Sequence, residues 1–274
     1  GNPLWSSSGI LICQSKNTFD PYGPPRTQFT LIADGMGGAI ITWKDRSHIT
    51  DDRDDPAYYD PIPVYSQRIS SDGELLWGEN TATGITGRTG ITFPGVVPDG
   101  TGGAIFAWND YKTVSRGVHD DFLRLQKLSP DGLPLWGDDG VLITASSPRR
   151  PLTEDEIASG AKGTFTRSLP TYDGKHDIVS DGSGGVVVFW TVEDEDSNYV
   201  VYAQRVDNEG NLVWQDKVAV GPSYNRYPSY EVVSDNSGGV IIATTVAESD
   251  LLRLQHVTGN GEVTWQYETI GYHA

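Results

Sequence analysis

Four short stretches of this chain share one order of polar and hydrophobic positions. Each begins with an aspartate and a glycine-rich turn, and continues into a run of β-branched, small or aromatic residues. The four stretches are Asp34–Trp43, Asp99–Trp108, Asp181–Trp190 and Asp235–Thr244. A glycine turn followed by such a run is typical of a hairpin corner that leads into a buried strand. We therefore predict four equivalent strands at these positions.

A second strand and a tryptophan-bearing turn follow each stretch. The strand carries a glutamine (Gln67, Gln126, Gln204 and Gln255), and the turn ends at a tryptophan (Trp77, Trp136, Trp214 and Trp265). Each aspartate precedes the end of its stretch by 9 positions, and each glutamine precedes its tryptophan by 10. In contrast, the distance from the end of the stretch to the glutamine varies, at 24, 18, 14 and 11 positions.

These spacings predict a four-stranded antiparallel unit in which two turns are fixed and the other connections vary. In an antiparallel meander, alternate turns lie at opposite edges, so one edge is constant and the other carries every insertion. Repeated four-stranded units are typical of β-propeller blades. We predict an all-β fold, a single β-propeller domain over 1–274, with four blades or as a fragment of a larger propeller. The predicted repeats span 27–90, 91–147, 170–222 and 228–271, with an extra N-terminal strand at 4–12.

Three motifs of the repeat resemble those of exported bacterial β-propeller proteins. They are the Asp-x-x-Gly-Gly corner, the Gln-Arg pair at Gln67-Arg68 and Gln204-Arg205, and the Asp-Gly-x-x-x-Trp turn at Asp72–Trp77. The turn is similar to the Asp-box of sialidase-type propellers, where glycine stands two residues after the aspartate, and the tryptophans resemble those of quinoprotein-type propellers. The resemblance implies a secreted or cell-surface location, and a fold that carries lectins, scaffolds and enzymes alike.

The amino-acid composition limits the classes of partner that this chain could bind. The chain has 37 acidic and 20 basic residues, for a net charge of −17, so it lacks the basic footprint of a nucleic-acid binder and is disfavoured at anionic membrane surfaces. Its single cysteine, Cys13, excludes an intrachain disulfide. The sequence contains no apolar run long enough to insert into a membrane and no signal peptide. Because it opens without methionine, we expect it to be a mature product or an excised part of a longer polypeptide.

The first variable connection is a candidate calcium site. It holds four carboxylates within five residues, at Asp51, Asp52, Asp54 and Asp55. Calcium takes six to eight oxygen ligands and tolerates loop geometry, so it is the one candidate cofactor. The stretch lacks the order of a known calcium loop, and the alternative interpretation is a solvated acidic loop.

Acidic residues also recur just after the repeated glycine-led strand, at Asp45, Asp110, Glu193 and Asp194, with Glu248 in the fourth repeat. In a ring they would converge near the mouth of the central channel, where paired carboxylates serve glycoside hydrolysis. The alternative is that each caps its strand or pairs with a nearby base. Tyrosines on the variable connections at this edge suit sugar or peptide binding, or else pack the loops onto the scaffold. They are Tyr58, Tyr59, Tyr111, Tyr172, Tyr224 and Tyr227.

The repeated polar residues have a structural interpretation. Gln67, Gln126, Gln204 and Gln255 are expected to satisfy backbone groups between strands, and Arg68 and Arg205 to be structural. The five histidines show no metal-site spacing, and the sequence contains no nucleophile elbow and no phosphate loop. We therefore expect a non-catalytic module that binds a glycan or a protein through the insertion-rich edge. The alternatives are a carbohydrate hydrolase or lyase that uses the channel-mouth carboxylates, and a structural spacer.

Overall fold

The computed structural model describes residues 9–12, 29–44, 62–78, 82–87, 95–115, 118–145, 176–193, 199–220, 229–246 and 251–270. These residues form four antiparallel sheets of four strands each, so the prediction of an all-β fold is confirmed. Within every sheet the hydrogen-bonded neighbours follow chain order, which is the meander that the constant and variable connections predict.

Each sheet comes from one continuous part of the chain. The first sheet consists of β1 (Phe29–Ala33), β2 (Ala39–Lys44), β3 (Ile62–Ile69) and β4 (Ala82–Gly87). The second consists of β5 (Gly95–Pro98), β6 (Ala104–Ser115), β7 (Val118–Leu128) and β8 (Val141–Ala145). The third consists of β9 (His176–Ser180), β10 (Val186–Glu193), β11 (Tyr199–Val206) and β12 (Val218–Ala219). The fourth consists of β13 (Tyr230–Ser234), β14 (Val240–Val246), β15 (Leu251–Val257) and β16 (Val263–Ile270).

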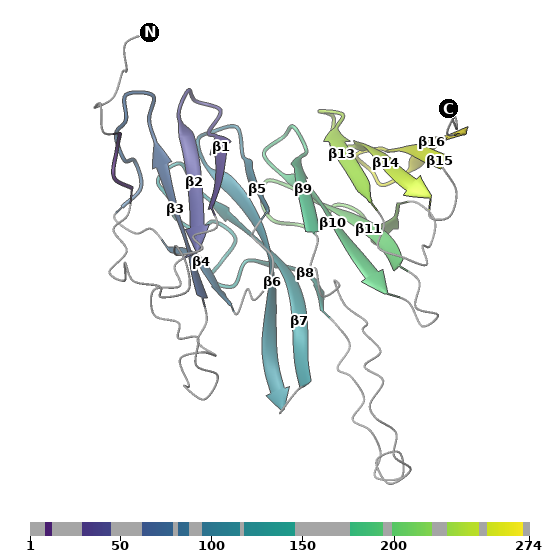
Figure 1. The fold of residues 1–274 in the computed structure, drawn as a ribbon, viewed down its shortest axis with the longest axis horizontal. Helices are drawn as coiled ribbons and strands as arrows, with labels where there is room; N and C mark the ends of the chain where they lie inside the picture. Colours follow the sequence, from purple (N-terminus) through teal and green to yellow (C-terminus); the bar gives the residue numbers. More distant parts are fainter. Residues whose placement is uncertain are drawn as a thin grey trace, which may run out of the picture.

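The sheets stand in a row in chain order, with the first and the fourth at opposite ends (Figure 1). Their first strands are neighbours: β1 lies beside β5, β5 beside β9, and β9 beside β13. Blades of a propeller have this arrangement, because their first strands line the central axis. Closure of the row into a ring of four blades stays a prediction.

The core lies between neighbouring sheets and explains why the second strand of each unit is so apolar. In β6, Phe106 and Trp108 pack toward the first sheet, while Ile105 and Ala107 pack toward the third. All four side chains are buried. A strand that is covered on both faces needs a continuous apolar run rather than an alternating one. In the second and third sheets, which have a neighbour on either side, the repeated stretch found in the sequence is therefore the strand that is covered on both faces.

Two details differ from the sequence prediction. The second variable connection is largely a long hairpin and not a loop, because β6 and β7 extend to Ser115 and Val118 and stay paired, for example at Lys112↔Asp120. Asp110 and Tyr111 therefore lie within β6 rather than after it. In the fourth sheet, Trp265 lies inside β16, whereas the tryptophans of the other sheets precede their last strands.

Candidate functional site

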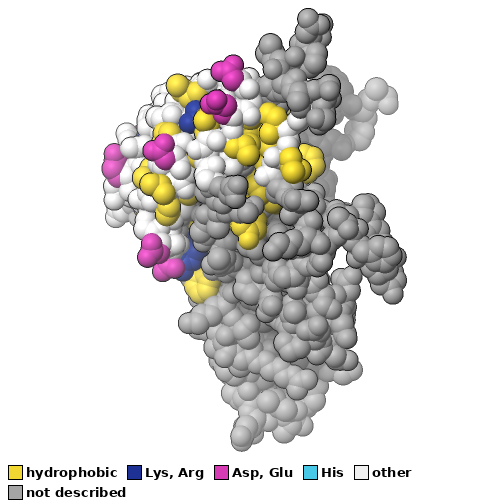
Figure 2. All heavy atoms as spheres, turned by 90° about the vertical axis from the view of Figure 1, so that its left-hand side faces the viewer, with side chains coloured by type: hydrophobic (Ala, Val, Ile, Leu, Met, Phe, Trp, Pro, Cys, Tyr) yellow, Lys and Arg dark blue, Asp and Glu magenta, His cyan; other side chains and the backbone are white. Residues whose placement is uncertain are grey.

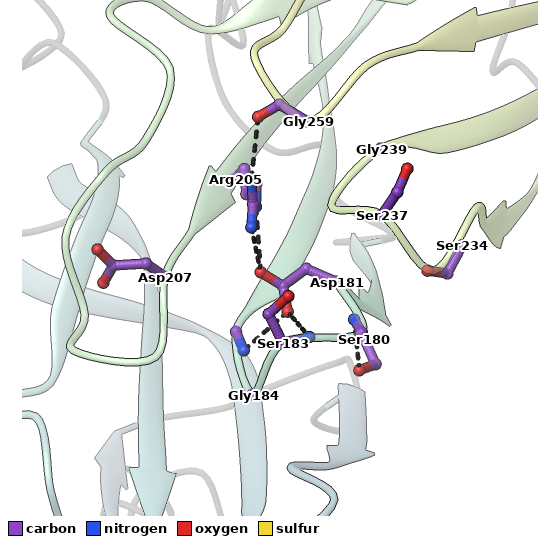
Figure 3. Close-up of polar contacts among 12 residues, drawn as sticks. Ser180, Asp181, Ser183, Gly184, Arg205, Asp207, Ser234, Ser237, Gly239 and Gly259 are labelled. Atoms are coloured by element: carbon purple, nitrogen blue, oxygen red, sulfur yellow. Dashed lines mark hydrogen bonds and ion pairs between the residues drawn. The ribbon is translucent and has the colours of Figure 1, made fainter.

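The aspartate at each corner closes the first hairpin of its sheet. In the third sheet, one carboxylate oxygen of Asp181 accepts hydrogen bonds from the backbone N–H groups of Ser183 (2.7 Å) and Gly185 (2.9 Å) (Figure 3). Asp34, Asp99 and Asp235 accept the equivalent pair of bonds in their own sheets. Because one carboxylate satisfies two backbone donors in a tight turn, this residue type recurs at a fixed spacing.

The second oxygen of each corner aspartate faces a base from the third strand. Arg68 Nε lies 2.8 Å from Asp34, and Arg205 Nη2 lies 2.9 Å from Asp181. In the second sheet the base is Lys127, and in the fourth it is His256, whose Nε2 lies 3.0 Å from Asp235. The carboxylates of Asp34 and Asp181 are almost fully buried, so these pairs belong to the interior rather than to the solvated surface. The expectation that Arg68 and Arg205 are structural is confirmed.

The same bases reach across to the next sheet. Arg205 Nη1 donates to the carbonyl oxygen of Gly259 at 3.1 Å, while its other nitrogens hold Asp181 (Figure 3). Arg68 reaches the carbonyl of Pro130 in the second sheet in the same way, and Lys127 reaches the carbonyl of Gly184 in the third. Three neighbouring pairs of sheets are thus tied by one kind of polar contact.

The repeated tryptophans complete each tie. Trp77 Nε1 donates to the carbonyl of Pro130 at 2.8 Å, and Trp214 Nε1 donates to that of Gly259 at 2.9 Å, so each tryptophan shares its acceptor with the arginine of its sheet. Trp136 donates to the carbonyl of Asn208 at 3.1 Å. We call each set of corner aspartate, base, tryptophan and next-sheet carbonyl an inter-sheet link. The three links are Asp34–Arg68–Trp77 on Pro130, Asp99–Lys127–Trp136 on Asn208, and Asp181–Arg205–Trp214 on Gly259.

Glutamine holds the tryptophan in place for this contact. Gln67 accepts from the backbone N–H of Trp77 at 2.9 Å and donates to its carbonyl at 3.0 Å, and it also accepts from the N–H of Arg68. Gln126 and Gln204 accept from the N–H of Trp136 and Trp214 in the same way. A buried side chain that satisfies backbone N–H and C=O groups at the tryptophan turn fixes the turn at a single spacing, which confirms the structural role predicted for these three glutamines.

The fourth sheet keeps only part of this set. The His256 ring stacks on Trp265, with centroids 5.5 Å apart, and its Nδ1 lies 2.6 Å from the hydroxyl of Thr264. Burial acts to raise the pKa of Asp235, but hydrogen bonds from His256, Ser237 and Gly239 outweigh it and lower the pKa to about 2. Ionised Asp235 therefore stabilises the fold fully above its ordinary pKa of 3.8, and this stabilisation is lost as the pH falls through about 2.

Replacing His256 with alanine is expected to raise the pKa of Asp235 by about one pH unit, because the substitution removes the hydrogen bond that the ring donates to the carboxylate. A carbon-detected NMR titration of the Asp235 carboxyl group measures this change directly. The carboxyl group of Asp34, which Arg68 holds in the first sheet, serves as the internal control and should titrate as before. A pKa that remains near 2 for Asp235 would show that the backbone donors alone account for the depression.

Most residues predicted for binding or catalysis lie outside the described part of the chain. These are Asp45, Asp51, Asp52, Asp54, Asp55, Tyr58, Tyr59, Tyr172, Asp194, Tyr224, Tyr227 and Glu248. Asp110 and Tyr111 lie in β6, opposite Phe122 and Asp121, and Glu193 ends β10, opposite Tyr199. We call the end of the sheets that holds the aspartate turns the corner edge, and the opposite end, which carries the insertions, the variable edge. Since β6 and β10 both start at the corner edge and run toward the variable edge, Asp110 and Glu193 lie toward the variable edge of adjacent sheets.

Sequence reasoning missed a polar contact between the first strand of the third sheet and the second strand of the second sheet. The buried His176 of β9 has its Nε2 2.8 Å from the carbonyl oxygen of Ala107 in β6, and so connects the third sheet to the second. Farther along the row, burial and the neighbouring Asp177 carboxylate raise the pKa of Tyr230 in β13, which keeps its hydroxyl protonated. Neither residue repeats along the chain, so no periodic signal marks it.

Comparison with known proteins does not identify a function for this chain. No protein-family model and no curated protein matches the chain. Within the described ranges, no group of three or more histidine, cysteine, aspartate or glutamate side chains is placed to hold a metal ion. The same residues include no helix long and apolar enough to cross a lipid bilayer.

Proposed function

We propose that this chain is a non-catalytic binding module with propeller-type blades, which holds a glycan or a protein at its variable edge. The observation that carries the proposal is the division between the two edges of the sheets. At the corner edge, the repeated charged and aromatic residues are taken up by the inter-sheet links, as in Arg205 with Asp181 and Gly259. They hold the scaffold together and are not available for a ligand.

The variable edge supports the proposal because its connections differ from one sheet to the next. The second sheet extends there as the β6–β7 hairpin, whereas in the third sheet β10 ends at Glu193 and β11 begins at Tyr199. The hairpin projects beyond the other strands (Figure 1). Different connections on a common rigid scaffold are the usual way in which proteins build binding sites. The net charge of −17 favours a neutral or cationic ligand over an acidic one.

The proposal also includes a cellular location and a cofactor for this module. A secreted or cell-surface protein of bacterial type fits the resemblance of the repeats, and calcium is the cofactor that the carboxylates of Asp51, Asp52, Asp54 and Asp55 would hold. Nucleic acid and membrane insertion are not part of it, because the composition provides neither a basic surface nor a long apolar segment.

A glycan array and a pull-down from culture medium test the proposal. Shortening the β6–β7 hairpin by removing residues 110–121 is expected to lower the affinity for a captured ligand at least about tenfold, since the hairpin projects beyond the other strands at the variable edge. Repeating each measurement with EDTA and with added calcium shows whether binding needs the ion. The matched control is Asp131→Asn, which changes an exposed carboxylate of the same sheet at the opposite edge and should leave binding unchanged.

A hydrolase or lyase is the second candidate, because Asp110 and Glu193 lie toward the same edge of adjacent sheets. Turnover of a glycoside panel that Asp110→Asn abolishes, and that Asp131→Asn leaves intact, would replace the binding proposal with the enzyme. A module that captures no ligand and turns over no substrate would instead be a structural spacer.

A further inference from the structure

The three inter-sheet links share one order along the chain. Each tryptophan precedes the last strand of its own sheet and contacts the sheet that follows in the chain: Trp77 contacts the second sheet, Trp136 the third and Trp214 the fourth. The contact surface on the receiving sheet is also constant. It consists of a left-handed glycine and the carbonyl group two residues before it, as in Gly132 with Pro130 and Gly210 with Asn208.

The first sheet carries this receiving surface as well. Gly73 has a φ of 87°, within the range of 81° to 89° found at Gly132, Gly210 and Gly261. The turn is closed by the same hydrogen bond, from the N–H of Gly73 to the carbonyl of Ser70 at 3.0 Å. By its position two residues before the glycine, the carbonyl of Ser71 is the equivalent acceptor. A tryptophan placed before the first sheet would therefore meet a turn of the required shape.

Residues 3–12 match a tryptophan-bearing segment that makes such a contact. They align without gaps to 134–143, with identical residues at Pro3, Leu4, Trp5, Gly9, Leu11 and Ile12. The backbone conformation also agrees at one aligned position: Gly9 has a φ of 77°, and the equivalent Gly140 has a φ of 67°. In the second sheet, this segment supplies Trp136 and then the last strand, β8.

The described part of the segment lies at the required end of the molecule. Residues 9–12, the darkest purple in Figure 1, lie on the side of the first sheet that faces away from the second. Figure 2 looks onto this end and shows hydrophobic side chains gathered there. Phe29 and Leu31 of β1 are 65% and 60% exposed, whereas Ile178, at the position of Leu31 in the third sheet, is 9% exposed.

We propose that residues 3–12 dock on the first sheet as the tryptophan-bearing segment of a fourth, partial inter-sheet link, which has the tryptophan and the next-sheet carbonyl but no corner aspartate. The Trp5 indole lies on Gly73 and donates its N–H to the carbonyl of Ser71. The segment brings no third strand and hence no base, so this link lacks the arginine or lysine of the others. For the same reason it leaves β1 uncovered, which accounts for the exposure of Phe29 and Leu31.

Hydrogen–deuterium exchange of the whole chain tests the docking. The variant Trp5→Ala is expected to speed exchange about tenfold in the peptide 69–77, which contains the receiving turn. Exchange in 128–136 and 206–214, the equivalent turns of the second and third sheets, should stay the same. The matched control is Ser6→Ala, which changes the neighbouring residue and keeps the indole. A direct measurement in the unaltered protein is the indole N–H resonance of Trp5, which should be protected from solvent as that of Trp77 is.

Three results would overturn the proposal. The first is unchanged exchange in 69–77 for Trp5→Ala together with a solvent-exposed Trp5 indole. The second is faster exchange of this peptide in Trp265→Ala instead, which would assign the surface to the fourth sheet and close the row into a ring. The third is exchange that slows with protein concentration, which would assign the surface to a second copy of the chain.

Discussion

Replacing Trp136 with alanine is expected to lower the free energy of unfolding by about 3 to 5 kcal/mol. The Trp136 ring is buried against Gly210 of the third sheet and belongs to the hydrophobic cluster between the second and third sheets. Its indole N–H also supplies the hydrogen bond to Asn208. The substitution removes the ring and leaves a cavity at the middle of the row. Urea unfolding followed by circular dichroism and by intrinsic fluorescence measures the loss.

The shape of the unfolding curve carries a second expectation. In a row of repeated units, stability is close to a sum of unit terms and nearest-neighbour interface terms. Weakening the middle interface should therefore separate the unfolding of the first two sheets from that of the last two. Hydrogen exchange under partial denaturation would then show β1 to β8 and β9 to β16 opening at different urea concentrations.

The control for this experiment is Trp265→Ala. Trp265 is only partly buried and stacks on His256 of its own sheet, so its removal should cost about 0.5 to 1.5 kcal/mol. A single cooperative transition with equal losses for both variants would contradict the assignment of stability to the inter-sheet links.

The sequence predicts the four sheets well because their signals are local. The corner aspartate, the left-handed glycine and the buried run all act within ten residues, so β2, β6, β10 and β14 lie where the repeated stretch predicts them. The fixed distance from glutamine to tryptophan has an equally local cause. Gln67 bonds both backbone groups of Trp77, and any other spacing would break one of those bonds.

The partner of each tryptophan could not be predicted in this way. Whether Trp77 faces Pro130 depends on the angle between two sheets, and no residue near Trp77 in the chain encodes that angle. The β6–β7 hairpin was missed for a different reason. Its outer half, from Asn109 to Asp121, is polar and lacks the apolar alternation that marks a half-buried strand.

The same division between local signals and the rest of the structure applies to the candidate site. The residues proposed for binding lie on connections that differ between units, so no repeat supports one residue against its neighbour. Asp110 and Tyr111 were placed by spacing from Trp108 alone, and the strand in fact continues through both of them. Position along the chain thus predicted the edge of the scaffold, but not the element that carries these side chains.

Replacing Gly210 with alanine is expected to lower the free energy of unfolding by about 2 to 5 kcal/mol. A β-carbon at this position would lie 2.9 Å from Trp136 Cδ1, closer than packed atoms tolerate. Two costs add: about 1 to 2 kcal/mol for a non-glycine residue at a φ of 89°, and about 1 to 3 kcal/mol for overpacking against the ring. Equilibrium unfolding in urea measures the total.

Gly137→Ala separates the two costs. Gly137 has a φ of 75°, and a β-carbon there would meet no atom within 4 Å, so this variant bears the backbone cost alone. The difference between the two variants isolates the contact with Trp136. In a double-mutant cycle, Gly210→Ala should cost less in the Trp136→Ala background, because the ring that it strikes is gone. Strictly additive losses would mean that the left-handed turn, and not the tryptophan that rests on it, requires glycine at this position.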